Sequence, residues 1–87
     1  MDEVILRLYV TRKNPYAKAA IQTLNQLQDR VNIKLEIVDV SENPDLAREN
    51  HLIAIPTLER IKPEPRRRII GDLSDAKALL KFIGCQL

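Results

Sequence analysis

Hydrophobic side chains recur at every second position in two segments of the chain, residues 4–10 and residues 33–40. A period of two is typical of a β-strand, so both segments are predicted to be strands. In the first segment both alternating sets are largely apolar, which predicts a strand in the middle of a sheet with helices on both faces. In the second segment the apolar side chains divide between two faces, with Ile33, Leu35 and Ile37 on one and Val38 and Val40 on the other.

Between these two segments the hydrophobic period changes to that of a helix. Asn14 is a favourable N-cap residue, and Pro15 suits the first helical position because the N–H that proline lacks would be unpaired there in any case. The apolar stripe of this helix runs to about Arg30 and consists of Ala17, Ala20, Ile21, Leu24 and Leu27. A strand, a helix and a strand in this order predict a βαβ unit with parallel strands and a right-handed crossover.

A second Asn-Pro pair repeats this arrangement on a smaller scale. Asn43 is predicted to cap a short helix that begins at Pro44 and ends near His51. The small apolar face of this helix would come from Leu46 and Ala47. The pattern therefore predicts a second, shorter helix directly after the second strand.

The rest of the chain predicts a hairpin and a last helix. Residues 56–61 and 66–70 are expected to pair in antiparallel fashion around the proline-rich turn at 62–65. Gly71 and Asp72 then interrupt the pattern, and Ser74 is a favourable N-cap. The apolar face of the last helix consists of Ala76, Leu79, Leu80 and Ile83, and Gly84 can close that helix. The complete predicted order is βαβαββα.

This order is that of the thioredoxin-like fold. Residues 1–87 are expected to form one α/β domain, because two domains in 87 residues would each be too small to bury an adequate core. The formal net charge of +2 does not indicate nucleic acid or an anionic membrane as a partner. No apolar run is long enough to span a bilayer, and the start of the chain is acidic, so we expect a cytoplasmic protein.

The chemistry usual for this fold is missing from the sequence. A dithiol enzyme needs two cysteines at the start of the first helix, where the helix N-terminus favours the thiolate. Residues 11–15 contain none, and the single cysteine, Cys85, follows the last helix. One cysteine and one histidine also make no convincing metal site. We therefore expect no catalytic residue, no metal and no cofactor, and a protein that acts by binding.

Some residues are candidates for that binding role. Lys13 and Asn14 stand where a redox pair would stand, although capping the helix already accounts for Asn14. The run 66–68 of three arginines, with Lys62, could contact an acidic surface of a partner or could simply protect an edge strand from aggregation. Pro56 stands where this fold places a cis-proline, before the third strand.

Six runs, in the same order along the chain, resemble the KaiB family of bacterial circadian clock proteins: residues 8–10, 14–15, 37–40, 43–47, 56–58 and 67–74. The last of these runs is the most specific because its eight residues are in register. The resemblance implies a protein of biological rhythms that is not an enzyme and that binds the N-terminal ATPase ring of the hexameric ATPase KaiC, sequesters KaiA and displaces the sensor kinase SasA.

The resemblance also implies two alternative folds. KaiB proteins switch between a ground state of order βαββααβ, which forms a tetramer, and the thioredoxin-like monomer that binds KaiC, so a homo-oligomer (dimer or tetramer) is one expectation. His51 stands where the family presents a basic contact to KaiC. Lys13, His51, Arg67 and Arg68 become the expected partner-binding residues. Pro56, Gly71 and Asp72 become the expected structural or switch residues, although Gly71 and Asp72 could equally form a simple turn that needs backbone freedom.

This chain departs from the family pattern at several positions. Thr11-Arg12 replaces a small Ala-Gly pair, Ile55 replaces a threonine, and Pro63-Glu64-Pro65 replaces a run of prolines. After Ser74 the similarity fades, and the last helix has no glycine in its interior. Removing a glycine from a helix interior favours the helix by roughly 0.5–1 kcal/mol. These residues favour the thioredoxin-like state over the alternative order.

Two other function classes remain open from the sequence. One is a sensory or adaptor domain similar to the N-terminal domain of SasA, acting in signalling or stress response outside a full clock. The other is a thiol enzyme that uses Cys85, which is the weaker alternative because the end of a helix disfavours a thiolate.

Overall fold

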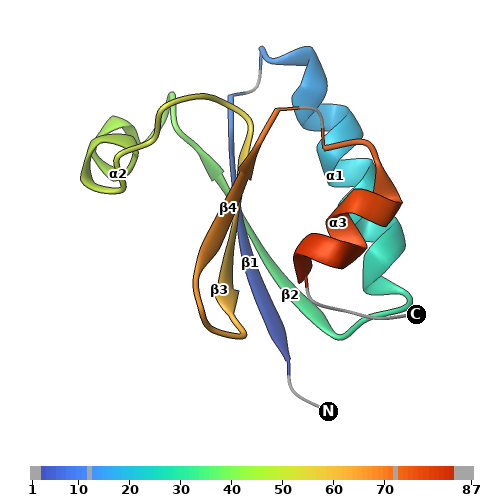
Figure 1. The fold of residues 1–87 in the computed structure, drawn as a ribbon. Coiled ribbons are helices and arrows are strands. Elements are labelled where there is room, and N and C mark those ends of the chain that lie inside the picture. Colours follow the sequence, from blue (N-terminus) through green and yellow to red (C-terminus); the bar gives the residue numbers. More distant parts are fainter. Residues whose placement is uncertain (1–2, 12, 72, 84–87) are drawn as a thin grey trace.

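The computed structural model of this chain describes residues 3–11, 13–71 and 73–83. Seven elements follow one another in the predicted order βαβαββα (Figure 1). They are β1 (Val4–Val10), α1 (Pro15–Gln28), β2 (Ile33–Asp39), α2 (Pro44–Glu49), β3 (Thr57–Lys62), β4 (Arg67–Ile70) and α3 (Ala76–Ile83). The thioredoxin-like prediction is confirmed, and the alternative order βαββααβ is not that of this structure.

The four strands form one sheet in the order β2-β1-β3-β4. β1 pairs with β2 in parallel and with β3 antiparallel, and β4 pairs antiparallel with β3. β1 is therefore an interior strand, as its largely apolar sequence predicts. Helices α1 and α3 lie together on one face of the sheet, whereas α2 lies on the other side (Figure 1).

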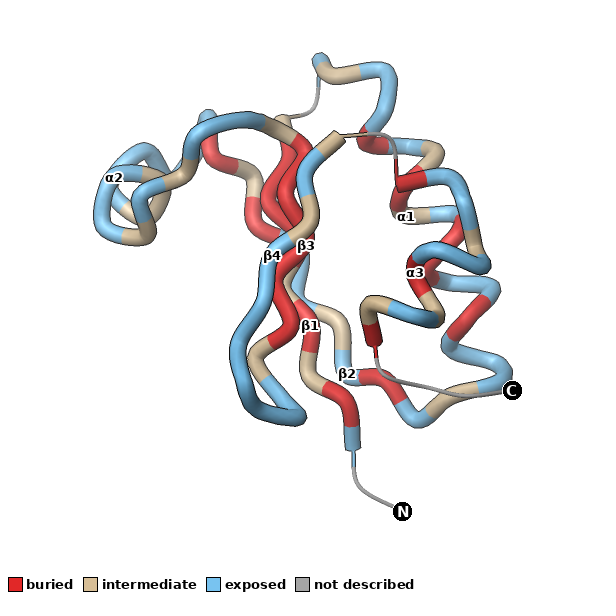
Figure 2. The backbone as a smooth tube through the Cα atoms, in the orientation of Figure 1, coloured by how far each residue is buried: buried red, intermediate tan, exposed pale blue. Residues whose placement is uncertain are grey.

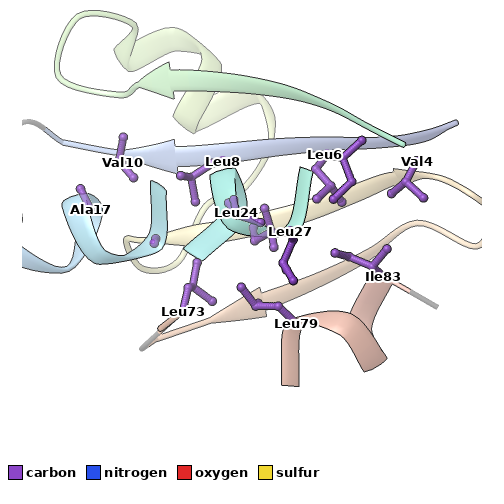
Figure 3. Close-up of a cluster of buried hydrophobic side chains, with 13 residues drawn as sticks. Val4, Leu6, Leu8, Val10, Ala17, Leu24, Leu27, Leu73, Leu79 and Ile83 are labelled. Carbon is purple, nitrogen blue, oxygen red and sulfur yellow. The ribbon is translucent and has the colours of Figure 1, made fainter. Parts of the chain in front are cut away.

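The main core fills the space between the sheet and the two helices α1 and α3. The alternate side chains of β1 that point to this side, Leu6 and Leu8, are completely buried, and so are Leu24 of α1 and Leu58 of β3. Leu79 and Ile83 of α3 close the cluster from below (Figure 3). Burying a leucine side chain stabilises a fold by roughly 1.5–3 kcal/mol, so this cluster is the main stabilising feature of the domain.

A smaller cluster lies on the other face of the sheet. Tyr9, Val38 and Val40 are buried there, and the partly buried side chains that cover them are Leu46, Ala47, Leu52 and Ile55. Helix α2 itself has no buried residue and protrudes from the rest of the molecule (Figure 2). Helices are thus present on both sides, as predicted, but on this second side the helix covers only the end of the sheet that carries Tyr9.

Ile37 lies on the same face of β2 as Ile33, as predicted, but is 47% exposed because β2 is an edge strand. Two predicted helix caps are wrong in detail. Asn43 makes no capping hydrogen bond with its side chain, and its Nδ2 donates instead to the carbonyl of Asp39 at 2.9 Å. The cap of α3 is not Ser74 but the next residue: Asp75 Oδ1 accepts from the backbone N–H of Lys77 at 3.0 Å and of Ala78 at 3.3 Å.

Candidate binding site

The start of α1 meets the loops before β3 and after β4. Asn14 connects the start of α1 with the loop before β3. Its Oδ1 accepts from the backbone N–H of Tyr16 at 2.8 Å, and its Nδ2 donates to the carbonyl of Ile55 at 3.2 Å. The Gly71 N–H donates to the carbonyl of Pro56 at 3.4 Å. Three segments that are far apart in the sequence are therefore joined at one place by hydrogen bonds.

A shallow cleft of about 350 Å³ opens at this junction. It is lined by Tyr16, Ile55, Pro56 and Gly71. The peptide bond between Ile55 and Pro56 is cis, and Pro56 is buried, whereas the Tyr16 side chain is 55% exposed. The lining is mostly apolar and holds no cysteine, so it is suited to contact with another chain and not to thiol chemistry.

Gly71 has a positive φ of 112°, a backbone conformation that residues other than glycine rarely adopt. A Cβ atom at this position would meet no heavy atom within 4 Å, so space is not what selects glycine. The backbone conformation is therefore sufficient to explain a glycine here, and the switch role of Gly71 stays a prediction. Its expected partner in that role, Asp72, lies outside the described residues, as do Gly84 and Cys85.

The predicted partner-binding residues lie at three different places in the fold. Lys13 is exposed and directly precedes Asn14 in the chain. His51 is exposed just after α2 and has a positive φ of 53°. Arg67 and Arg68 are both exposed on the edge strand β4, but consecutive residues of a strand point to opposite faces of the sheet. The structure thus places these residues before α1, after α2 and on β4, and the binding role of each stays a prediction.

Sequence reasoning missed two groups of polar residues that are part of the sheet. In the first, Glu59 is 5% exposed, and its carboxylate accepts hydrogen bonds from the Tyr9 hydroxyl at 3.4 Å and from Arg68 Nε at 3.1 Å. In the second, Arg60 is 7% exposed and donates to the carbonyls of Pro65 and Phe82, each at 2.9 Å. The available signal was a pair of charged residues, Glu59 and Arg60, between the apolar Leu58 and Ile61 of one strand.

Arg7 is connected to the first of these groups. Its Nη1 donates to the Tyr9 hydroxyl at 3.4 Å, and its Nε lies 3.3 Å from Glu36 Oε2. The hydrogen bond to Tyr9 is the main cause that raises the pKa of Arg7 above its usual value, with a smaller contribution from Glu36 and against a lowering by partial burial. Arg7 is therefore a permanent cation beside the buried Glu59 carboxylate.

Replacing Asn14 by alanine is expected to lower the free energy of unfolding by about 1–2 kcal/mol, because the helix loses its cap and the loop before β3 loses a hydrogen bond. Asn43 is a matched control because it also precedes a proline that begins a helix but makes no capping hydrogen bond. We expect a smaller loss for Asn43→Ala in urea denaturation. Equal losses would contradict the role assigned to Asn14.

The fold and this site define a thioredoxin-like domain without a thiol pair at the start of its first helix. The structure is similar to the N-terminal domain of SasA from Synechococcus elongatus, with a TM-score of 0.75, 26% sequence identity, and coverage of 99% of this chain and 88% of that one. A mutant thioredoxin from Halobacterium salinarum has a TM-score of 0.80 at 22% identity over 92% of this chain and 71% of that one, a similarity of fold alone.

Similarity in sequence is more specific. The model of the KaiB domain matches residues 7–85. The circadian clock oscillator protein KaiB from Parasynechococcus marenigrum is 44% identical over 79 residues, which cover 87% of this chain and 76% of that protein. The chain belongs to the KaiB family, and the resemblance found in the sequence is confirmed.

Proposed function

We propose that this chain is a clock component of the KaiB type, which binds the N-terminal ATPase ring of a KaiC-type protein and modulates its phosphorylation and ATPase cycle. It would act by binding, without catalysing a reaction of its own. The observation that carries this proposal is the 44% identity to a circadian clock oscillator protein KaiB over 79 residues.

The geometry of the cleft supports a binding role. Where a thiol enzyme of this fold holds its reactive cysteines, this chain holds Lys13 and Asn14, and the latter is used for a cap and for a hydrogen bond to the carbonyl of Ile55. The exposed Tyr16 side chain beside Pro56 provides apolar area for a partner. Aromatic side chains of this kind are enriched among the residues that dominate protein–protein binding.

We further expect the contact with the ring to include Lys13, His51, Arg67 and Arg68, all of which are exposed. The other partners would be a KaiA protein or a SasA-like kinase, which would meet the chain in the cytoplasm. A homo-oligomer, a dimer or a tetramer, would belong to a resting state of the alternative fold. We expect neither nucleic acid nor a membrane as a partner. Among the described residues, no helix is long and apolar enough to cross a bilayer.

The test is co-migration of the chain with a purified KaiC-type ring from the same organism, in each phosphorylation state of the ring. Lys13→Ala, His51→Ala and Arg67→Ala are each expected to weaken binding by about fivefold, as for residues that contribute about 1 kcal/mol to an interface. Lys34→Ala, an exposed lysine on β2 outside the expected contact, serves as the control. No association in any state, or equal weakening by the control, would contradict the proposal.

A second candidate function is an adaptor domain similar to that of SasA. The observation that favours it is the similarity of the whole fold to the N-terminal domain of that protein, over 99% of this chain. The two functions differ in their expected partner. An adaptor would associate with the catalytic part of a kinase, whereas a KaiB-type protein would compete with a SasA-like kinase for the ring, so a competition experiment with all three purified proteins distinguishes them.

A further inference from the structure

The two edge strands of the sheet, β2 and β4, differ in their protection against pairing with a further strand. β4 has only four residues, begins two positions after Pro65 and carries the exposed Arg67 and Arg68. A short edge strand, a proline and exposed charges are features that commonly prevent pairing between sheets. β2 has seven residues, contains neither proline nor glycine and pairs with β1 without a register shift. β2 is therefore the less protected edge.

The backbone of β2 has open hydrogen-bonding groups along this edge. The carbonyl of Asn32, just before the strand, accepts from the N–H of Val4 at 2.9 Å and so points toward β1. Successive residues of a strand direct their N–H and C=O groups to opposite sides, so Leu35 and Ile37 direct theirs away from β1. Among the described residues, no hydrogen bond reaches these outward groups of Leu35 and Ile37. A further strand could pair with them.

The side chains of this edge on the α1 side are apolar and incompletely covered. Leu35 is half-buried, and Ile37 is 47% exposed. A groove of about 600 Å³ lies between α1 and β2, and Ile21 and Ile37 are among the residues that line it. A strand paired with residues 33–37 would therefore cover apolar surface of Ile37 that is open to solvent in the single chain.

The sequence of β2 is complementary to itself in one antiparallel register. Outward groups must meet outward groups, so the two-fold axis of such a pair passes between one residue and the same residue of the other copy. An axis at Lys34 or at Glu36 places like charges directly opposite each other, which is destabilising. An axis at Ile37 leaves both charged residues without a charged partner. An axis at Leu35 places Lys34 of each copy opposite Glu36 of the other, and Ile33 opposite Ile37.

We propose that the edge of β2 is a docking surface for a second copy of this chain, with the two β2 strands antiparallel and the two-fold axis at Leu35. Glu36 Oε2 lies 3.3 Å from Arg7 Nε of its own chain, so its carboxylate would stand between that guanidinium and Lys34 of the second copy. Each copy has one β2 edge, and the protected β4 edges lie at the two ends of the joined sheet. The association therefore closes as a dimer.

The small contact area indicates a dimer that forms and dissociates readily. Pairing over residues 33–37 buries well below about 1,200 Å² in total, which is the range of weak and transient interfaces. This inference goes beyond the proposed clock function. It also differs from an oligomer of the resting state, because both copies keep the order βαβαββα. Binding to a KaiC-type ring and pairing of β2 edges are measured separately, so either one can fail without the other.

The first test is sedimentation and backbone NMR of the full chain from about 20 µM to about 1 mM, which covers weak dissociation constants. We expect an equilibrium between monomer and dimer, concentration-dependent amide shifts at Leu35 and Ile37, and slower hydrogen exchange of the Leu35 N–H at high concentration. The shifts of α3 should stay helical throughout. A monomer at every concentration, shifts confined to other strands, or strand-like shifts of α3 in the dimer would overturn the proposal.

A pair of charge reversals tests the register. Lys34→Glu and Glu36→Lys each place like charges opposite each other at both cross-strand pairs, so each variant alone is expected to dimerise about tenfold more weakly. An equimolar mixture of the two variants restores opposite charges at both pairs, and its mixed dimer should be within about threefold of the wild type. Wild-type dimerisation by either variant alone, or a mixture no tighter than the single variants, would overturn the register.

Cysteine cross-linking gives a second measurement if a charge reversal does not fold. Cys85→Ser removes the native thiol, and oxidised glutathione then converts two introduced thiols into one disulfide. Residue 35 would face its own copy at a Cα–Cα distance of about 5.5 Å, within the range of a disulfide. Residue 37 would be four residues, or about 13 Å, out of register with its own copy. We expect Leu35→Cys to cross-link about tenfold faster than Ile37→Cys. Equal rates, or a faster Ile37→Cys, would overturn the pairing at Leu35.

Discussion

Leu24→Ala is expected to lower the free energy of unfolding by about 3 kcal/mol. The side chain of Leu24 is completely buried and lies between the sheet and α3 (Figure 3), so its removal leaves a cavity that the surrounding elements cannot fill. A domain of this size has a total stability of roughly 4–13 kcal/mol, so the loss is a large fraction of it. Urea denaturation followed by circular dichroism measures the change.

Ile37→Ala is the matched control for this prediction. Both side chains are aliphatic and of similar size, but Ile37 is 47% exposed and lines a groove between α1 and β2. Its replacement should cost less than about 1 kcal/mol, because little apolar area returns to water. Losses of equal size for the two variants would show that the main core does not lie where the structure places it.

Arg60→Ala is expected to lower the free energy of unfolding by about 2–3 kcal/mol, because hydrogen bonds that involve a charged group contribute more than neutral ones. The buried guanidinium of Arg60 donates to the carbonyl of Phe82 in the last turn of α3 and to that of Pro65 in the turn before β4. Alanine would leave both carbonyls without this donor. Thermal unfolding, with loss of helical signal from α3, measures the effect.

Arg67→Ala is the control for Arg60→Ala, because Arg67 lies directly opposite Arg60 in the register of β3 and β4 but is exposed. An exposed side chain without such contacts is expected to change stability by less than about 0.5 kcal/mol. The same variant serves in the binding experiment with the ring, where an unchanged fold makes a loss of affinity interpretable. A loss of stability for Arg67→Ala as large as for Arg60→Ala would contradict the assigned roles.

Local patterns of the sequence were sufficient for the elements themselves. β1 has the predicted bounds, and α1 begins at Pro15 after an Asn14 cap and ends two residues before the predicted limit. These features depend on neighbouring residues: the period of apolar side chains, the missing N–H of proline and the capping amide. The predicted helix caps were less accurate at Asn43 and Ser74, because several nearby side chains can compete for the same backbone N–H and C=O groups.

The candidate site was predicted only in its parts. Asn14, Pro56 and Gly71 were each singled out in the sequence, but their meeting at one cleft depends on the packing of α1 beside the loops of β3 and β4. The sequence singled out Arg66 and Arg68, but their contacts with the buried Glu59 were missed for a similar reason. Tyr9 and Glu59 are 50 positions apart in the chain, and only the pairing of β1 with β3 brings them together.

Residue types and short-range periodicity were enough to predict the order of the elements and the absence of a thiol pair from the first helix. The resemblance to the KaiB family came from six short runs, and comparison with known sequences confirmed it. Three other properties became known only from the packing of distant segments. They are the strand that lies at an edge of the sheet, the part of the sheet that α2 covers, and the charged side chains that are buried and hydrogen-bonded. These properties depend on the strand register, and a shift by one residue would turn every side chain of a strand to the opposite face of the sheet.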